Sequence, residues 1–360
     1  MIIHILLFNA MGGAESWLLK KNSGNWDETI VVVHSSLGLK HLPVGKCVIA
    51  PSRLMVFRSF FFYMKLFKKL RPSQIHCHID LYSVMPLLCS FLSRVPSRVL
   101  HIHSCGLEFK RGTILSPFFS ISSFCIRQII LFCCSKIFYV SRVALDTFIF
   151  PRKIPMSPGD AYQFSPPIYS DMIDFFNPFQ FLLKSDSVSG IFSDVREVII
   201  LHVGRYHESF FFDNPKNHYL IFKIAKLEEC RNRRFIFLGI DAFTEIKIRK
   251  KYNLSDNISF FPAVSDPRPF YANCDAFIFP SLHEGFGLSF LEAQLMGLPC
   301  IISHMVPVES IINSKSVKVI HSLKNENLWF KEIPNDKLTH VNRITNANTA
   351  SNNFNKLINR

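Results

Sequence analysis

The sequence predicts an α/β protein built from two doubly wound parallel-sheet domains. Short apolar segments alternate along the chain with segments of helical periodicity, which is the pattern of strands and helices in a parallel sheet. With 360 residues, the chain is long enough for two domains that each bury a core. The region 164–193 interrupts the alternation, since it is rich in Pro, Ser and Asp and has no clear period. We therefore expect one domain on each side of a linker.

The expected strands follow in chain order. In the first half, apolar segments predict strands at 2–8, 29–34, 47–50, 75–78, 99–103 and 137–140. In the second half, they predict strands at 198–203, 235–238, 258–261, 276–279, 300–303 and 317–320. The expected domains are 1–165 and 194–343, joined by a linker at 166–193. The segment 344–360 keeps apolar residues at helical spacing and is expected to close the fold as a helix.

Composition excludes several classes of protein. Hydrophobic residues make up 48% and charged residues 19%, which is typical of a globular chain and not of a disordered one. The ten cysteines have no Cys-x-x-Cys spacing, so we expect reduced thiols. Residues 1–8 have the pattern of a short buried strand without a basic leader, so we expect a cytosolic protein without a signal peptide. The longest apolar region, 114–140, contains Pro117, Arg127, Gln128 and Lys136, and a spanning helix is not expected there.

The formal net charge of +14 predicts anionic partners. Basic residues concentrate at 58–71, where Lys65, Lys68 and Lys69 alternate with aromatic and aliphatic side chains. This pattern fits an amphipathic helix on a membrane interface, and it equally fits a helix that packs on its own domain with a solvated basic face. No zinc-finger spacing, RNA-recognition signature or basic repeat is present, so we do not expect nucleic acid as a partner.

The most informative segment is 276–292. An apolar strand (276–279) precedes a turn with Gly285 and Gly287, and apolar residues at helical spacing follow it. At such a strand-to-helix junction, backbone N–H groups and the positive end of the helix dipole favour an anion, and glycine allows a phosphate to approach closely. Glu292 would then lie about one and a half turns into the helix, where it can accept ribose hydroxyls. The alternative is a structural glycine turn with two solvated glutamates.

The stretch 275–299 (DAFIFPSLHEGFGLSFLEAQLMGLP) resembles the nucleotide-sugar-binding segment of glycosyltransferase family 4, whose members are retaining enzymes of the GT-B fold. Within that family the chain is most similar to bacterial capsule and exopolysaccharide enzymes. Further matching segments occur in family order at 11–15 (MGGAE), 75–78 (IHCH), 100–104 (LHIHS), 203–205 (VGR) and 216–218 (KNH). The resemblance implies two Rossmann-like domains that face each other across a cleft.

The resemblance also implies roles for individual residues. Arg205 and Lys216 would bind the donor diphosphate, together with the turn residues Gly285, Phe286, Gly287 and Leu288. Gly12 and Gly13, after the first strand, could lend backbone N–H groups to a phosphate or to the acceptor. Glu284 would contact sugar hydroxyls, Glu292 would hold the ribose, and either His101 or His103 would face the donor sugar.

No metal is expected, because no convincing Asp-x-Asp motif follows a strand. Fixed positive groups would instead neutralise the departing diphosphate. A zinc site is the competing hypothesis, since His76, His78 and Asp80 alternate along one strand and His101, His103 and Cys105 along another.

Two segments depart from the family pattern. The loop between Arg205 and Lys216 is longer than usual, which could displace Lys216, and the family's hinge appears here as residues 157–160 with only Asp160 kept. The resemblance thus implies a retaining transferase that moves a hexosyl unit from a nucleoside-diphosphate sugar to a lipid-linked acceptor in surface polysaccharide biosynthesis. We expect a cytoplasmic protein, with peripheral contact at the inner face of the cell membrane as the open alternative. A nucleotide-sugar epimerase, or a non-catalytic donor-binding member of an assembly complex, are the alternatives.

Overall fold

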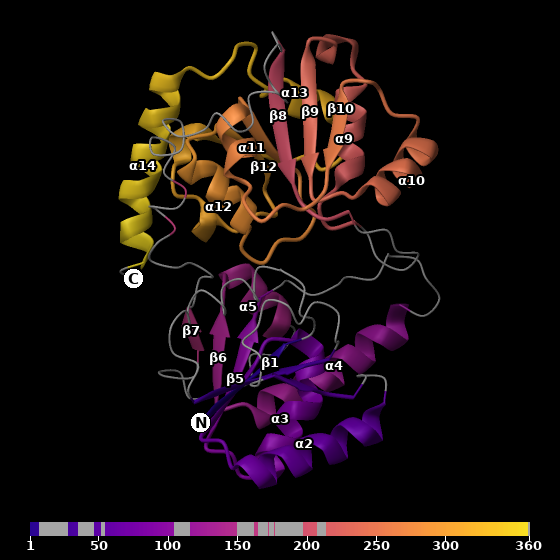
Figure 1. Cartoon of the computed structure of the whole chain (residues 1–360), viewed down its shortest axis with the longest axis vertical. Helices are drawn as coiled ribbons and strands as arrows, with labels where there is room; N and C mark the ends of the chain where they lie inside the picture. Colours follow the sequence, from indigo (N-terminus) through magenta and orange to yellow (C-terminus); the bar gives the residue numbers. More distant parts are fainter. Residues whose placement is uncertain are drawn as a thin grey trace. The chain divides into compact units, whose positions relative to one another are not determined.

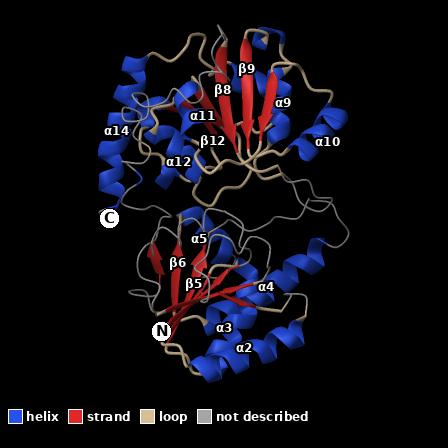
Figure 2. Ribbon diagram, viewed as in Figure 1, coloured by secondary structure: helices blue, strands red, loops and turns tan. Residues whose placement is uncertain are grey.

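A computed structural model describes residues 1–6, 28–34, 47–51, 55–103, 116–149, 162–164, 172, 176, 197–206 and 214–358. The chain divides into two compact units, Met1–Tyr169 (unit 1) and Ser170–Arg360 (unit 2). Each unit contains one parallel sheet accompanied by helices (Figures 1 and 2). The predicted α/β fold class is therefore confirmed.

Unit 1 holds a seven-stranded sheet in the order β3-β2-β1-β4-β5-β6-β7. All its strand pairs are parallel. Its strands are β1 (Ile2–Leu6), β2 (Thr29–Val33), β3 (Cys47–Ile49), β4 (Gln74–Cys77), β5 (Ser97–Ile102), β6 (Lys136–Tyr139) and β7 (Tyr162–Phe164). Its helices are α2 (Val56–Leu70), the short 3₁₀ helix η2 (Asp80–Ser83), α3 (Val84–Leu92), α4 (Ser116–Cys133) and α5 (Arg142–Ile149). Strand β7 was not expected, because its three residues carry too short a pattern to separate from the Pro- and Ser-rich segment that follows.

Unit 2 holds a six-stranded sheet in the order β10-β9-β8-β11-β12-β13. Its strands are β8 (Val198–Val203), β9 (Arg233–Leu238), β10 (Ile258–Phe261), β11 (Ala276–Phe279), β12 (Cys300–Ser303) and β13 (Val317–Ile320). The α-helices are α9 (His218–Ala225), α10 (Ala242–Tyr252), α11 (Arg268–Asn273), α12 (Leu288–Leu295), α13 (Glu326–Phe330) and α14 (His340–Ile358). The described residues of the unit also form three short 3₁₀ helices: η3 (Glu228–Cys230), η4 (Val308–Ser310) and η5 (Ser314–Ser316).

Phenylalanine supplies much of the core of unit 2. Phe222, Phe235 and Phe237 are fully or almost fully buried and pack with apolar residues of β8, β9 and α9. Phe277 and Phe279 are likewise buried on β11, with their rings stacked 5.6 Å apart. These buried positions account for part of the chain's 37 phenylalanines as core packing.

The closing helix α14 docks on unit 2 next to α12, where Figure 1 shows the two helices side by side. Gly297, just after α12, has a φ of 74°, and a Cβ there would collide with the backbone carbonyl group of Arg343 on α14. The buried Arg343 guanidinium donates to the carbonyl oxygens of Tyr271 (2.8 Å), Met296 (3.3 Å) and Cys274. Helix α14 is thereby fastened to the backbone of α11 and to the loops that follow α11 and α12.

Among the described helices, none combines the length and the apolar character that crossing a membrane requires. Helix α2 instead divides into two faces. Ser59, Tyr63 and Phe67 are buried against unit 1, whereas Phe57 and Phe61 are 81% and 69% exposed.

Candidate functional site

The predicted strand, turn and helix at 276–292 are present in unit 2. Strand β11 lies between β8 and β12, and all its residues are buried. Helix α12 begins at Leu288, and Gly287 caps it with a φ of 89°, a backbone conformation that favours glycine. The first turn of α12 contains no acidic residue. The start of this helix therefore presents its N–H groups without a nearby carboxylate from its own first turn.

Lys216 and Glu284 meet at this turn although they lie far apart in the sequence. The Lys216 ammonium forms an ion pair with a Glu284 carboxylate oxygen, and it lies 4.6 Å from the centre of the Phe279 ring. The side chains are 22% and 14% exposed, so the pair is only partly open to solvent. The amide of Leu282 also donates to the carbonyl oxygen of Pro215 (2.8 Å), which joins the two segments. Lys216 is thus not displaced from the turn by the long loop before it.

Arg205 follows β8 and is exposed at the carboxyl end of that strand. Its neighbour Gly204 packs against the Lys216 side chain: a Cβ on Gly204 would lie 3.2 Å from Lys216 Cγ. Gly239, after β9, packs in turn on Gly204, with a φ of 110°. The ends of β8, β9 and β11 therefore gather the segments that carry both predicted diphosphate-binding cations.

Glu292 lies on α12, half-buried, and accepts a hydrogen bond from the Tyr271 hydroxyl group (2.8 Å). The same hydroxyl is 3.1 Å from the carbonyl oxygen of Ser289. Burial, and then the Glu292 charge, raise the pKa of Tyr271 well above its usual value, so the phenol stays protonated and can donate. Tyr271 thus orients the predicted ribose-binding carboxylate.

His202 on β8 was not predicted as a site residue. Its Nδ1 donates to the carbonyl oxygen of Ile278 (2.9 Å), and within the described part of the chain its buried Nε2 has no hydrogen-bond partner. Burial lowers the pKa of His202 to about 4, and the Lys216 charge adds to this shift. The only signal in the sequence was one histidine inside the otherwise apolar strand 198–203.

In unit 1, His101 and His103 belong to a larger group of histidines. His101 is 3% exposed and its Nε2 lies 2.7 Å from Nδ1 of His76. His103 is half-buried and its Nε2 lies 2.9 Å from Nδ1 of His78, whose Nε2 lies 3.1 Å from Nδ1 of His4. The structure thus connects histidines of β1, β4 and β5, including His4, which sequence reasoning missed.

Among the described residues, two sets of three histidines have one nitrogen of each member within 4.8 Å of the others: His4, His76 and His78, and His78, His101 and His103. These sets differ from those that the sequence suggested along single strands. Asp80 is not a member of either set, and Cys105 lies outside the described residues. Gly12, Gly13, the loop at 207–213 and the hinge at 157–160 also lie outside the described residues, so their predicted roles stay predictions.

Comparison with known proteins agrees with the geometry of unit 2. Residues 197–330 match the family described as Glycosyl transferases group 1. The putative glycosyltransferase EpsF of Bacillus subtilis is 29% identical over 248 residues, which is 65% of this chain and 58% of that protein. The O-antigen biosynthesis glycosyltransferase WclY of Escherichia coli is 34% identical over 67 residues, 19% of each chain. The alignment with EpsF therefore spans less than two thirds of that relative's length.

Solved structures with the same fold include Anabaena HepE in complex with UDP-glucose. It has a TM-score of 0.71 and 16% identity, and the match covers 100% of this chain and 94% of that one. WaaG, a glycosyltransferase involved in lipopolysaccharide biosynthesis, has a TM-score of 0.66 and 14% identity over 98% and 94% of the two chains. At this level of identity the likeness establishes the fold, and it agrees with the predicted GT-B architecture.

Proposed function

We propose that this chain is a retaining glycosyltransferase in polysaccharide biosynthesis, because residues 197–330 of unit 2 match the family described as Glycosyl transferases group 1. It would move a hexosyl unit from a nucleoside-diphosphate sugar to an acceptor. The observation that carries the proposal is the placement of Lys216, ion-paired with Glu284, beside the glycine turn that begins α12. A cation, a carboxylate and the N–H groups of the first turn of α12 would then lie around one position that suits a sugar diphosphate.

In the proposed transfer, the bond between the anomeric carbon and the diphosphate oxygen breaks as the acceptor oxygen bonds to that carbon on the same face. The acceptor's proton passes to the leaving diphosphate. Negative charge therefore grows on the diphosphate, and donors fixed in advance lower the barrier most. Lys216, Arg205 and the N–H groups at the start of α12 would supply this stabilisation, and no metal would be needed for it.

Glu284 and Glu292 would hold the two ends of the donor. Glu284 accepts from Lys216 and would accept sugar hydroxyls, which positions the sugar against the diphosphate-binding cation. Glu292, oriented by Tyr271, would accept the ribose hydroxyls. His103 would contact the sugar from unit 1, because it is half-buried whereas His101 is 3% exposed.

The test is incubation of the protein with a panel of radiolabelled nucleotide sugars and membrane lipid extract. Release of nucleoside diphosphate together with labelled lipid supports the proposal. Recovery of an isomerised nucleotide sugar would indicate an epimerase, and binding without release would indicate a non-catalytic member of an assembly complex. Added Mg²⁺ or Mn²⁺ should change the rate by less than about 2-fold, because the cations of the chain neutralise the leaving group.

We further propose that unit 1 contacts an anionic membrane surface, where a lipid-linked acceptor would be found, so that the protein works at the cytoplasmic face. The support is helix α2, which exposes Phe57 and Phe61 and carries Lys68 and Lys69 in its last turn, with no acidic residue in its first turn. Neighbouring helices expose Phe91 and Phe132, whose rings lie 5.4 Å apart.

Sedimentation with vesicles that contain anionic lipid tests this contact. At low salt the wild-type protein should pellet with the vesicles, and the double variant Phe57→Ser and Phe61→Ser should remain in the supernatant. Phe243→Ser, which changes an exposed phenylalanine of unit 2, is the matched control and should pellet like the wild type. Wild-type protein that stays in the supernatant would contradict the membrane contact.

A further inference from the structure

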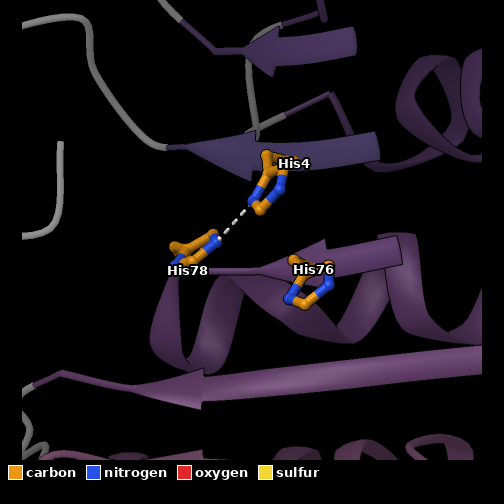
Figure 3. Close-up of side chains that lie close together, drawn as sticks. All are labelled: His4, His76 and His78. Atoms are coloured by element: carbon orange, nitrogen blue, oxygen red, sulfur yellow. Dashed lines mark hydrogen bonds between the residues drawn. The ribbon is translucent and has the colours of Figure 1, made fainter. Parts of the chain in front are cut away.

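The sheet of unit 1 carries five histidines on one face, far more than a donor-sugar contact requires. In the parallel pair β1 and β4, His4 is the register partner of His76, and His78 follows two residues later. Residues at spacing two point to the same face of a strand, so the side chains of all three emerge together (Figure 3). His101 and His103 on and after β5 continue the row.

We propose that His4, His76 and His78 form a binding site for one divalent transition-metal ion, with zinc as the physiological class of ligand. One nitrogen of each of these residues lies within 4.8 Å of the others. The separation of 3.1 Å between Nδ1 of His4 and Nε2 of His78 is close to the roughly 3.3 Å between ligand nitrogens around a tetrahedral zinc ion with bonds of about 2.0 to 2.1 Å. The charged groups of the proposed transfer belong to unit 2, and none of the three ligands His4, His76 and His78 has a role in that proposal.

Two of the three proposed ligands are buried. His4 and His78 are each only 7% exposed. Imidazole is the commonest metal ligand among protein side chains, and it binds in its neutral form.

The remaining two histidines fit the role of outer partners. Metal-binding histidines usually donate their second ring N–H to a nearby acceptor, which fixes the tautomer and the ring orientation. If His78 binds through Nε2, its Nδ1 can donate to Nε2 of His103 at 2.9 Å. Nδ1 of His76 lies 2.7 Å from Nε2 of His101, so His76 would bind through Nε2 and donate to His101. One assignment of tautomers therefore satisfies both contacts.

The chemistry of the donors selects the class of ion. Imidazole nitrogen suits zinc, copper, nickel and iron, whereas magnesium and calcium prefer oxygen ligands. Neither set of three histidines includes a carboxylate, and so a water molecule or an anion would complete the coordination. The rings of His4, His76 and His78 are nearly parallel, with interplanar angles of 16° to 21° and the centroids of His4 and His76 4.6 Å apart. Metal binding therefore requires ring rotations out of this stacked arrangement.

The experiment is titration of the full chain, purified with a tag that contains no histidine, with Co²⁺ and then Zn²⁺. We expect one Co²⁺ per chain, with the visible absorption of a four-coordinate cobalt ion that Zn²⁺ abolishes. Mg²⁺ should not compete. Absence of a stoichiometric cobalt spectrum would overturn the proposal.

Variants identify the ligands. His4→Gln should weaken binding by more than the 10- to 100-fold range that is typical of outer partners, and His103→Gln should fall within about that range. The reverse order, with binding retained in His4→Gln and lost in His103→Gln, would refute this ligand set in favour of His78, His101 and His103. His76→Gln, at a half-buried position, provides a second ligand test if His4→Gln does not fold by circular dichroism.

The matched control is His304→Gln. His304 and His321 form a stacked pair in unit 2, with centroids 5.3 Å apart and His304 exposed, and could bind cobalt adventitiously. Binding that is unchanged in this variant supports the site in unit 1. Binding that disappears with His304 would assign the ion to that surface pair and overturn the proposal.

Discussion

The two units share one topology but place different chemistry along their sheets. In unit 2, the charged side chains of Lys216 and Glu284 lie at the ends of the strands, next to the start of α12. The N–H groups of that helix start add a partial positive charge. In unit 1, the strands gather histidines that burial keeps neutral, such as His78 and His103. Charged groups suit a ligand that gains or carries charge, whereas neutral imidazoles suit hydrogen bonds and metal ions. The same doubly wound sheet therefore offers two kinds of site.

The largest expected effect on turnover comes from removing the positive charge of Lys216 in unit 2. Lys216→Met keeps the apolar stem beside Gly204 and Phe279 but removes the ammonium group. We expect turnover to fall about 100- to 1000-fold, the range for loss of one preorganised donor at a developing negative charge. Steady-state kinetics with the donor found in the panel measures it.

Lys226→Met is the matched control, because Lys226 lies in the same unit and donates to the carbonyl oxygen of Tyr252 on an exposed surface. It should keep wild-type turnover. If Lys216→Met turns over as fast as Lys226→Met, the charged site in unit 2 is not where the diphosphate leaves.

A smaller effect on turnover should show which of His101 and His103 in unit 1 acts in the proposed transfer. His103 is half-buried, so we expect His103→Ala to reduce turnover about 10- to 100-fold without a large loss of stability. His101 is 3% exposed and packs edge-on against Phe138, so His101→Ala should mainly lower the unfolding free energy. Parallel kinetics and urea unfolding of the two variants check this. A turnover defect confined to His101→Ala would reverse the assignment.

Lowering the pH should reduce the unfolding free energy through the buried His202 of unit 2. Burial lowers the pKa of His202 to about 4, so between pH 6.5 and 4 the unfolded chain binds a proton that the folded chain does not. The unfolding free energy should therefore fall as the pH falls through this window, by up to about 1.4 kcal/mol per pH unit for this residue.

Urea unfolding at pH 7, 6 and 5 measures the slope. His202→Gln retains a side-chain donor for the Ile278 carbonyl group but cannot titrate, and it should show the shallower slope. Equal slopes for the two proteins would mean that His202 titrates alike in the folded and unfolded states.

The smallest expected effect comes from removing the hydrogen bond between Tyr271 and Glu292. Tyr271→Phe removes the hydroxyl group that donates to this carboxylate while keeping the buried ring. We expect a loss of about 1 kcal/mol of stability, the typical net value of one hydrogen bond, and a KM for the donor raised a few-fold. A variant with an unchanged KM would indicate that Glu292 needs no orientation by Tyr271, or does not bind the ribose.

The parts of the site that could be predicted from sequence are those set by local pattern. The strand at 276–279, the turn with Gly287 and the helix after it occupy one continuous segment, and their order follows from apolar spacing and glycine. The resemblance to a known family added Lys216, whose partner Glu284 lies on a segment 68 residues away.

The parts that could not be predicted depend on register between distant strands. His4 joins the histidine row only because β1 pairs with β4 so that His4 stands beside His76. The preference for His103 over His101 likewise depends on burial, which alternation along one strand does not reveal. His202 was missed because a single histidine in an apolar strand is indistinguishable from a packed core residue until its neighbours are known.

The contact at Gly297 has a consequence for protein engineering and for the choice of homologues. Because the backbone of α14 touches the backbone beside this glycine, even a methyl group there would push the last helix away from the unit that carries the charged site. Directed-evolution libraries should therefore leave codon 297 unchanged, and a natural sequence with a larger residue at the equivalent place should seat its final helix differently.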